Sequence, residues 1–112
     1  MSYLTEDAKL LEKKYQDDDM RKLYRMHARR ARLLGLWAAE KIFIFGEKAS
    51  DYAVTIVMAD HAEPGGEGMR KKIEYDFKQN NIAFDENEFV QKCSDLLFKA
   101  ESEILQENDV YA

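Results

Sequence analysis

Residues 33–39 read Leu-Leu-Gly-Leu-Trp-Ala-Ala and leave a helix no polar face. A helix that is apolar all round belongs inside a bundle rather than on its surface. Gly35 stands in the middle of this stretch, where glycine costs about 1 kcal/mol relative to alanine. We therefore expect a neighbouring helix, or the indole of Trp37, to pass too close to Gly35 for a Cβ atom. Leu34, Gly35 and Trp37 are predicted core residues.

Residues that break helices are rare, because the 112-residue chain has one proline and five glycines. This composition favours a few long helices. The pattern predicts helices from Met20 to about Phe45 with Gly46 as C-cap, over 51–62 with Ser50 as N-cap, over 67–79 ended by Asn80-Asn81, and from an N-cap at Asp85. The fold class is all-α: a four-helix bundle-like domain, residues 20–112, with a mobile N-terminal arm, residues 1–19.

Apolar residues at helical spacing mark the faces that we expect to be buried. In the last two helices they are Met69, Ile73 and Phe77, then Phe89, Cys93, Leu96, Leu97, Ala100 and Ile104. The aromatic side chains at such spacing are predicted to be core rather than a base-stacking surface. They are Trp37, Phe43, Phe45, Tyr52, Phe77, Phe89 and Phe98.

The first nineteen residues carry only a thin apolar stripe. Leu4, Leu11 and Tyr15 recur at i, i+7 and i+11, which is too narrow to hold a segment firmly on a core. The three aspartates at 17–19 repel one another and are poor residues for a helix interior. We expect this arm to be a nascent helix that becomes ordered against a partner.

The net charge of −5 hides an uneven distribution. Residues 20–37 carry +6 with no acid, so the rest of the chain carries −11. Arg21, Arg25, Arg29 and Arg32 share one side of a helix, and the Arg29-Arg30 pair reads as part of a solvated cationic face. Such a face could pair with acids of its own bundle, with an acidic protein, or with phosphates. Because the pI is near 5.1 and no nucleic-acid-reading motif is present, nucleic acid ranks last and is not an expected partner.

Catalytic and cofactor chemistry is hard to assemble from this sequence. His27 and His61 are the only imidazoles, and neither lies near Cys93 in the sequence. A single cysteine excludes an internal disulfide, and we expect Cys93 to be a buried structural residue. His61 beside Asp60 and Glu63 matches no trusted metal-ligand spacing. We predict a protein that is not an enzyme and holds no metal or cofactor.

The chain is also expected not to span a membrane. No apolar run approaches the roughly 20 residues that a spanning helix needs, and the first residues do not resemble a signal peptide. These features predict a cytoplasmic protein.

Residues 29–39 also carry a family likeness. The motif is Arg29-Arg30-x-Arg32-Leu33-Leu34-Gly35-Leu36-Trp37-Ala38-Ala39, joined by Glu12-Lys13-Lys14-Tyr15, Ala49-x-x-Tyr52-Ala53, Ala59-Asp60, Glu63-Pro64-Gly65, Glu67, Lys72-Ile73 and Asp76-Phe77. This pattern resembles the ATPase inhibitor subunit zeta family, small proteins that bind the F1 part of ATP synthase. The likeness extends over nearly the whole chain.

The resemblance implies a non-enzymatic inhibitor of ATP hydrolysis. In this family the arm becomes helical and inserts between an α and a β subunit of F1, close to γ, while the four-helix domain stays outside. The residues expected to contact F1 are Leu4, Leu10, Leu11, Glu12, Lys13, Lys14 and Tyr15. The stretch Glu6-Asp7-Ala8 departs from the family's Asp-Arg-Glu run by placing an acid where the family has arginine. The implied location is the cytoplasmic face of the inner membrane. The free protein is expected to be a monomer. Weak binding of ATP or ADP is a further expectation.

An alternative of another class uses the basic helix itself. In that interpretation residues 21–32 bind an anionic ligand or an acidic protein, and the chain is a small nucleotide-sensing or adaptor domain. Titration with ATP or ADP, followed by the fluorescence of Trp37 beside the arginines, distinguishes it from the inhibitor.

Overall fold

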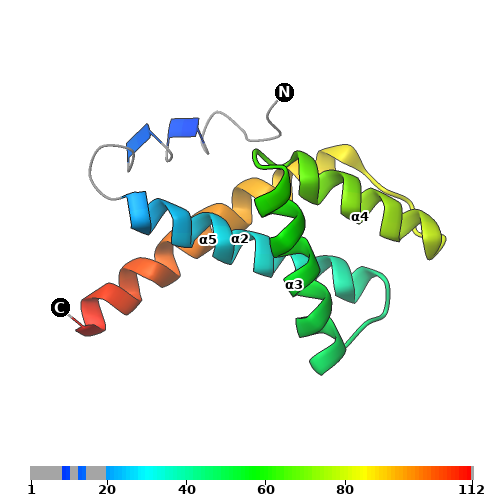
Figure 1. The fold of residues 1–112 in the computed structure, drawn as a ribbon, viewed down its shortest axis with the longest axis horizontal. Helices are drawn as coiled ribbons and strands as arrows, with labels where there is room; N and C mark the ends of the chain where they lie inside the picture. Colours follow the sequence, from blue (N-terminus) through cyan, green and yellow to red (C-terminus); the bar gives the residue numbers. More distant parts are fainter. Residues whose placement is uncertain (1–8, 11–12, 15–19, 112) are drawn as a thin grey trace.

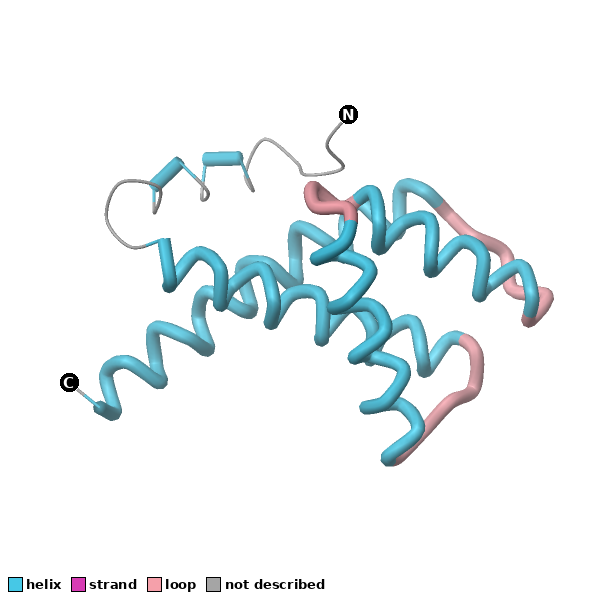
Figure 2. The backbone as a smooth tube through the Cα atoms, viewed as in Figure 1, coloured by secondary structure: helices cyan, strands magenta, loops and turns pink. Residues whose placement is uncertain are grey.

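The described part of the chain from residue 20 to residue 111 folds into α2 (Met20–Lys41), α3 (Glu47–Ala62), α4 (Glu67–Gln79) and α5 (Glu86–Tyr111) (Figure 1). The computed structural model describes residues 9–10, 13–14 and 20–111, with side chains to residue 107. Within these residues the chain is helix and loop without a strand (Figure 2). The all-α prediction is therefore confirmed. None of the helices in this part of the chain is long and apolar enough to cross a membrane.

Helix α2 is the centre of the bundle, because it contacts α3, α4 and α5. Figure 1 shows α3 lying across α2, α4 following on the far side of α3, and α5 returning along α2. The main core cluster joins all four helices and includes Leu34, Ile56, Met69 and Phe89. A second, smaller cluster joins the first half of α2 to the middle and later turns of α5 and consists of Leu23, Met26, Leu97 and Ile104. The core thus has two parts that meet along α2.

Gly35 lies where α2 and α3 come closest. A Cβ atom at this position would stand 2.6 Å from the Cα atom of Ala53, so only glycine fits without a shift of the backbone. The apolar stretch around it is less enclosed than expected, because Leu33, Leu36 and Trp37 are only partly buried. Trp37 packs at the edge of the main cluster, with its ring centroid 5.9 Å from that of Phe77. The neighbouring helices leave that side of α2 open.

The end of α2 differs from the prediction. The helix ends at Lys41 rather than near Phe45, and Gly46 is the N-cap of α3 instead of the C-cap of α2. The end is a Schellman motif, in which the Ile44 N–H donates to the Ala39 carbonyl at 2.9 Å and the Phe43 N–H donates to the Glu40 carbonyl at 3.1 Å. Phe43 holds the left-handed position with φ 62°, which is normally a glycine position.

The next helix consequently begins earlier than predicted. Helix α3 starts at Glu47, so Ser50 lies inside it and is not an N-cap. Between α2 and α3 the chain is no longer helical, and successive side chains alternate in direction. Ile42 and Ile44 pack on the core, whereas Phe43 and Phe45 are exposed. The prediction that Phe43 and Phe45 are core residues is therefore wrong, and so is that for Phe98, which is also exposed.

The later helices follow the sequence pattern closely. Helix α4 ends at Asn80-Asn81 as predicted, with Asn81 at φ 58°. The carboxylate oxygen Oδ1 of Asp85 accepts hydrogen bonds from the N–H groups of Asn87 and Glu88, which confirms the N-cap of α5. The expected buried faces are Met69, Ile73 and Phe77 of α4 and Phe89, Cys93, Leu97, Ala100 and Ile104 of α5, all buried, with Leu96 partly buried.

Replacing Phe43 with glycine should stabilise the protein. The substitution removes the cost of a left-handed conformation at a residue with a Cβ atom, and it loses little packing because Phe43 is 76% exposed. We expect the free energy of unfolding to rise by about 0.5–1 kcal/mol, measured by urea denaturation. Phe43→Ala is the control, because it keeps the Cβ atom and should change stability little. Equal stability of the glycine and alanine variants would contradict this account.

Replacing Gly35 with alanine should destabilise the protein, although alanine is the better helix former. The new Cβ atom meets the backbone of Ala53 rather than a flexible side chain, and overpacking of this kind costs about 1–3 kcal/mol. We expect a lower unfolding midpoint in urea. Glu40→Ala, at an exposed position of the same helix, should stay within about 0.5 kcal/mol of the original chain. A Gly35→Ala midpoint at or above that of the original chain refutes the close approach.

Candidate functional site

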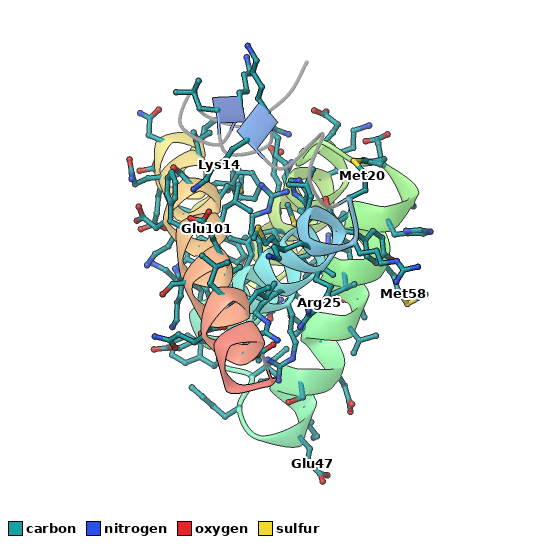
Figure 3. The ribbon with its side chains drawn as sticks, turned by 90° about the vertical axis from the view of Figure 1, so that its left-hand side faces the viewer. Lys14, Met20, Arg25, Glu47, Met58 and Glu101 are labelled. Carbon is teal, nitrogen blue, oxygen red and sulfur yellow. The ribbon has the colours of Figure 1, made fainter. Side chains whose placement is uncertain are left out.

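The residues expected to contact a partner lie mostly in the first fifteen positions. Leu4, Leu11, Glu12 and Tyr15 fall outside the described residues. Of those that are described, Leu10 is 65% exposed, and Lys13 and Lys14 are exposed as well. The Lys14 ammonium lies 3.8 Å from a carboxylate oxygen of Glu101 on α5, and both residues stand at one end of the molecule (Figure 3). The described part of the arm thus places an exposed leucine among lysines.

The predicted basic face is largely paired with α5. Arg25 donates to Glu107 at 3.0 Å, and Arg29 donates to Glu103 at 3.4 Å and also to Glu107. The hydrogen bond with Arg29 is the main reason why the pKa of the Glu107 carboxyl lies below its usual value. Arg21 and Arg32 are exposed. Figure 3 shows Arg25 close to the last turns of α5. Arg25 and Arg29 therefore neutralise acids of the same bundle.

Arg30 differs from its neighbour Arg29, and the solvated Arg29-Arg30 face expected from the sequence is wrong at this residue. The Arg30 side chain is 1% exposed. On α2 it continues the buried line of Met26 and Leu34 at i+4 spacing. Its Nε and Nη1 atoms are buried without a hydrogen-bond partner. A charged group is therefore held where a core side chain would be expected.

A pocket of about 330 Å³ opens beside Arg30, between α2 and α3. Its walls are Tyr24, His27, Ala28 and Arg30 of α2, Val57, Asp60 and His61 of α3, and Pro64 and Gly65 of the following turn. Tyr24, His61 and Pro64 are exposed at its rim, whereas Arg30 is buried. The Oδ1 atom of Asp60 is also buried without a hydrogen-bond partner. The pocket thus combines apolar walls with two opposite charges.

Burial shifts the ionisation of the groups around this pocket. It lowers the pKa of His27 to about 4, and the charge of Arg30 acts in the same direction. It raises the pKa of the Asp60 carboxyl, while Arg30 opposes that change. Burial also raises the pKa of the Cys93 thiol to about 11, so this thiol is protonated and unreactive at neutral pH. Cys93 is buried, as the sequence predicted.

The acidic and imidazole groups near this turn do not converge on one point. Glu63 forms an ion pair with Lys71 at 2.9 Å, which turns it toward α4 rather than toward His61. In the part of the chain that the structure describes, no group of three or more His, Cys, Asp or Glu side chains could hold a metal ion. The charged side chains of opposite sign that line the pocket are therefore those of Arg30 and Asp60.

The depressed pKa of His27 predicts a loss of stability in mild acid. Between pH 6.5 and 4 the unfolded chain binds a proton at His27 that the folded protein does not, so the free energy of unfolding decreases as pH falls. By pH 5 we expect a loss of about 2 kcal/mol relative to pH 7. Urea denaturation at both pH values measures this loss of unfolding free energy. The His27→Gln variant should lose clearly less stability between pH 7 and pH 5 than the original chain. If the stability of the His27→Gln protein had the same pH dependence as that of the original chain, protonation of His27 would be ruled out as the cause of the loss.

Comparison with known proteins agrees with the sequence motif. The sequence model of ATPase inhibitor subunit zeta matches residues 1–103. No curated protein and no solved structure matches the chain. The matched region includes the arm, all of α2, α3 and α4, and most of α5. The chain therefore belongs to the ATPase inhibitor subunit zeta family.

Proposed function

We propose that this protein inhibits ATP hydrolysis by the F1 part of ATP synthase, with its N-terminal arm as the inhibitory element. The observation that carries the proposal is the family match, which begins at residue 1 and so includes the arm. The family name describes an inhibitor subunit of an ATPase, which is a regulator rather than a catalyst. On binding, the protein is peripheral to the membrane that holds ATP synthase.

The arm acts as a wedge at an α/β interface of F1, close to γ. Leu4, Leu10, Leu11 and Tyr15 supply apolar contacts, and Glu12, Lys13 and Lys14 supply charged ones. The exposed side chain of Leu10 supports this assignment, because it is available to a partner. Ordering the arm on F1 has an entropic cost that these contacts must exceed. The bundle of residues 20–112 holds the arm from outside F1.

The contacts of the basic helix favour this function over the adaptor alternative. Arg25 and Arg29 are hydrogen-bonded to carboxylates of α5. An anionic ligand on this face would have to compete with those carboxylates. Removing both acids by Glu103→Gln and Glu107→Gln would free the arginines. An adaptor that uses this face should then bind ATP or ADP more tightly, whereas an inhibitor that uses its arm is unaffected.

Deletion of the arm should abolish inhibition and leave the bundle folded. The ATPase rate of F1 from the same organism is measured with the full chain, with a chain that lacks residues 1–19, and with Leu11→Ala/Tyr15→Ala. We expect at least tenfold weaker inhibition by both altered proteins, because each loses the apolar anchors. Circular dichroism checks that residues 20–112 remain helical.

The matched control removes the same kinds of side chain from the bundle surface. Val54 and Tyr75 are 55% and 62% exposed, and Val54→Ala/Tyr75→Ala should inhibit like the original chain. Inhibition that survives deletion of the arm would refute the wedge. Loss of inhibition in the Val54 and Tyr75 control, with the Leu11 and Tyr15 variant unaffected, would assign the effect to the bundle.

A further inference from the structure

The pocket between α2 and α3 contains a buried guanidinium, that of Arg30, and a partly buried carboxylate, that of Asp60, and the hydrogen bonds of both groups are incomplete. The Nε and Nη1 atoms of Arg30 and the Oδ1 atom of Asp60 have no hydrogen-bond partner. No ion pair joins the two side chains, although each is close enough to influence the other electrostatically. Buried polar groups in proteins are nearly always satisfied. A ligand that carries both an acceptor and a donor would complete these hydrogen bonds.

Arg30 lines the pocket, and the charge of its buried side chain is not needed to fill this position of α2. Its position on α2 continues a line of core residues, Met26 and Leu34. Replacement of a buried pair of charges by apolar side chains of similar size is commonly neutral or stabilising. Arg30 is also unlike Arg25 and Arg29, whose charges are matched by glutamates. An unmatched buried guanidinium in a pocket is consequently better explained by binding than by folding.

The charges and the size of the pocket define the ligand class. A carboxylate fits the fork of N–H donors on Arg30, whereas Asp60 disfavours ligands with several negative charges and accepts from an ammonium. The volume of about 330 Å³ lies at the lower end of the range for ligand pockets, so the ligand is small. Val57 and Pro64 line the same pocket and supply apolar contacts. These properties are those of a small amino acid with an apolar side chain.

We propose that this pocket binds an apolar α-amino acid as its zwitterion. The ligand carboxylate accepts a hydrogen bond from the Arg30 guanidinium, its ammonium donates to Oδ1 of Asp60, and its side chain lies against Val57 and Pro64. Tyr24 and His61 stand at the opening, where the ligand enters. This site belongs to the bundle, and binding does not require residues 1–19.

The test is a titration of the ¹⁵N-labelled full chain with L-leucine, followed by amide chemical shifts of the pocket residues and by calorimetry. N-acetyl-L-leucine lacks the ammonium, and L-leucinamide lacks the carboxylate. We expect saturable shifts with leucine at residues such as Ala28, Asp60 and Gly65, and at least tenfold weaker binding of both derivatives. A lack of saturation with leucine means that the pocket holds only water and overturns the proposal. Equal binding of either derivative, or shifts there with ATP or ADP only, also overturns it.

Variants assign the binding to the two charged side chains. Asp60→Asn keeps the shape but weakens the ammonium contact, and it should weaken leucine binding at least tenfold. Asp51→Asn, at an exposed position of the same helix, is the matched control and should bind normally. Arg30→Met should lose leucine binding, and circular dichroism checks that the variant remains helical in the absence of ligand. Leucine binding that is intact in either Asp60→Asn or Arg30→Met overturns the proposal.

Discussion

The close crossing of α2 and α3 at Gly35 is the constraint on which the rest of the structure depends. Because the Ala53 backbone stands where a Cβ of residue 35 would be, α3 is held directly against the centre of α2. A similar approach occurs at Gly68, where a Cβ atom would lie 2.1 Å from the Ala59 carbonyl oxygen. These two glycines fix α3 between α2 and the start of α4. The pocket beside Arg30 lies between α2 and α3, and the glycine contacts set the separation of these helices.

Helix α2 meets its neighbours with chemically different faces. Toward α3 it presents small and apolar residues, which allow backbones to approach. Toward the second half of α5 it presents arginines that meet Glu103 and Glu107, alongside a small apolar cluster. Exposed ion pairs of this kind contribute little stability individually. They instead fix which side of α2 faces α5.

Much of the fold could be predicted because local signals agreed with packing. The Asp85 cap, the Asn80-Asn81 stop and the spacing of Met69, Ile73 and Phe77 each had one physical interpretation, and all are observed. The end of α2 could not be predicted, since the sequence offers Gly46 for a role that Phe43 takes despite its Cβ atom. The pocket was also missed, because it requires α2 and α3 to be placed relative to each other. One signal was available: residue 30 fills the gap between Met26 and Leu34 in an otherwise apolar line.

The role of the Arg30 side chain is therefore determined by its surroundings rather than by its residue type. Among six basic residues on this part of α2, a charge count treats Arg30 as one more member of a solvated face. The three-dimensional structure separates it, because Arg25 and Arg29 have carboxylate partners while two nitrogen atoms of Arg30 have none. A bundle selected only for stability would favour an apolar side chain there. That Arg30 and Asp60 share one pocket with unsatisfied atoms of opposite charge is consistent with a second role for the bundle besides holding the arm.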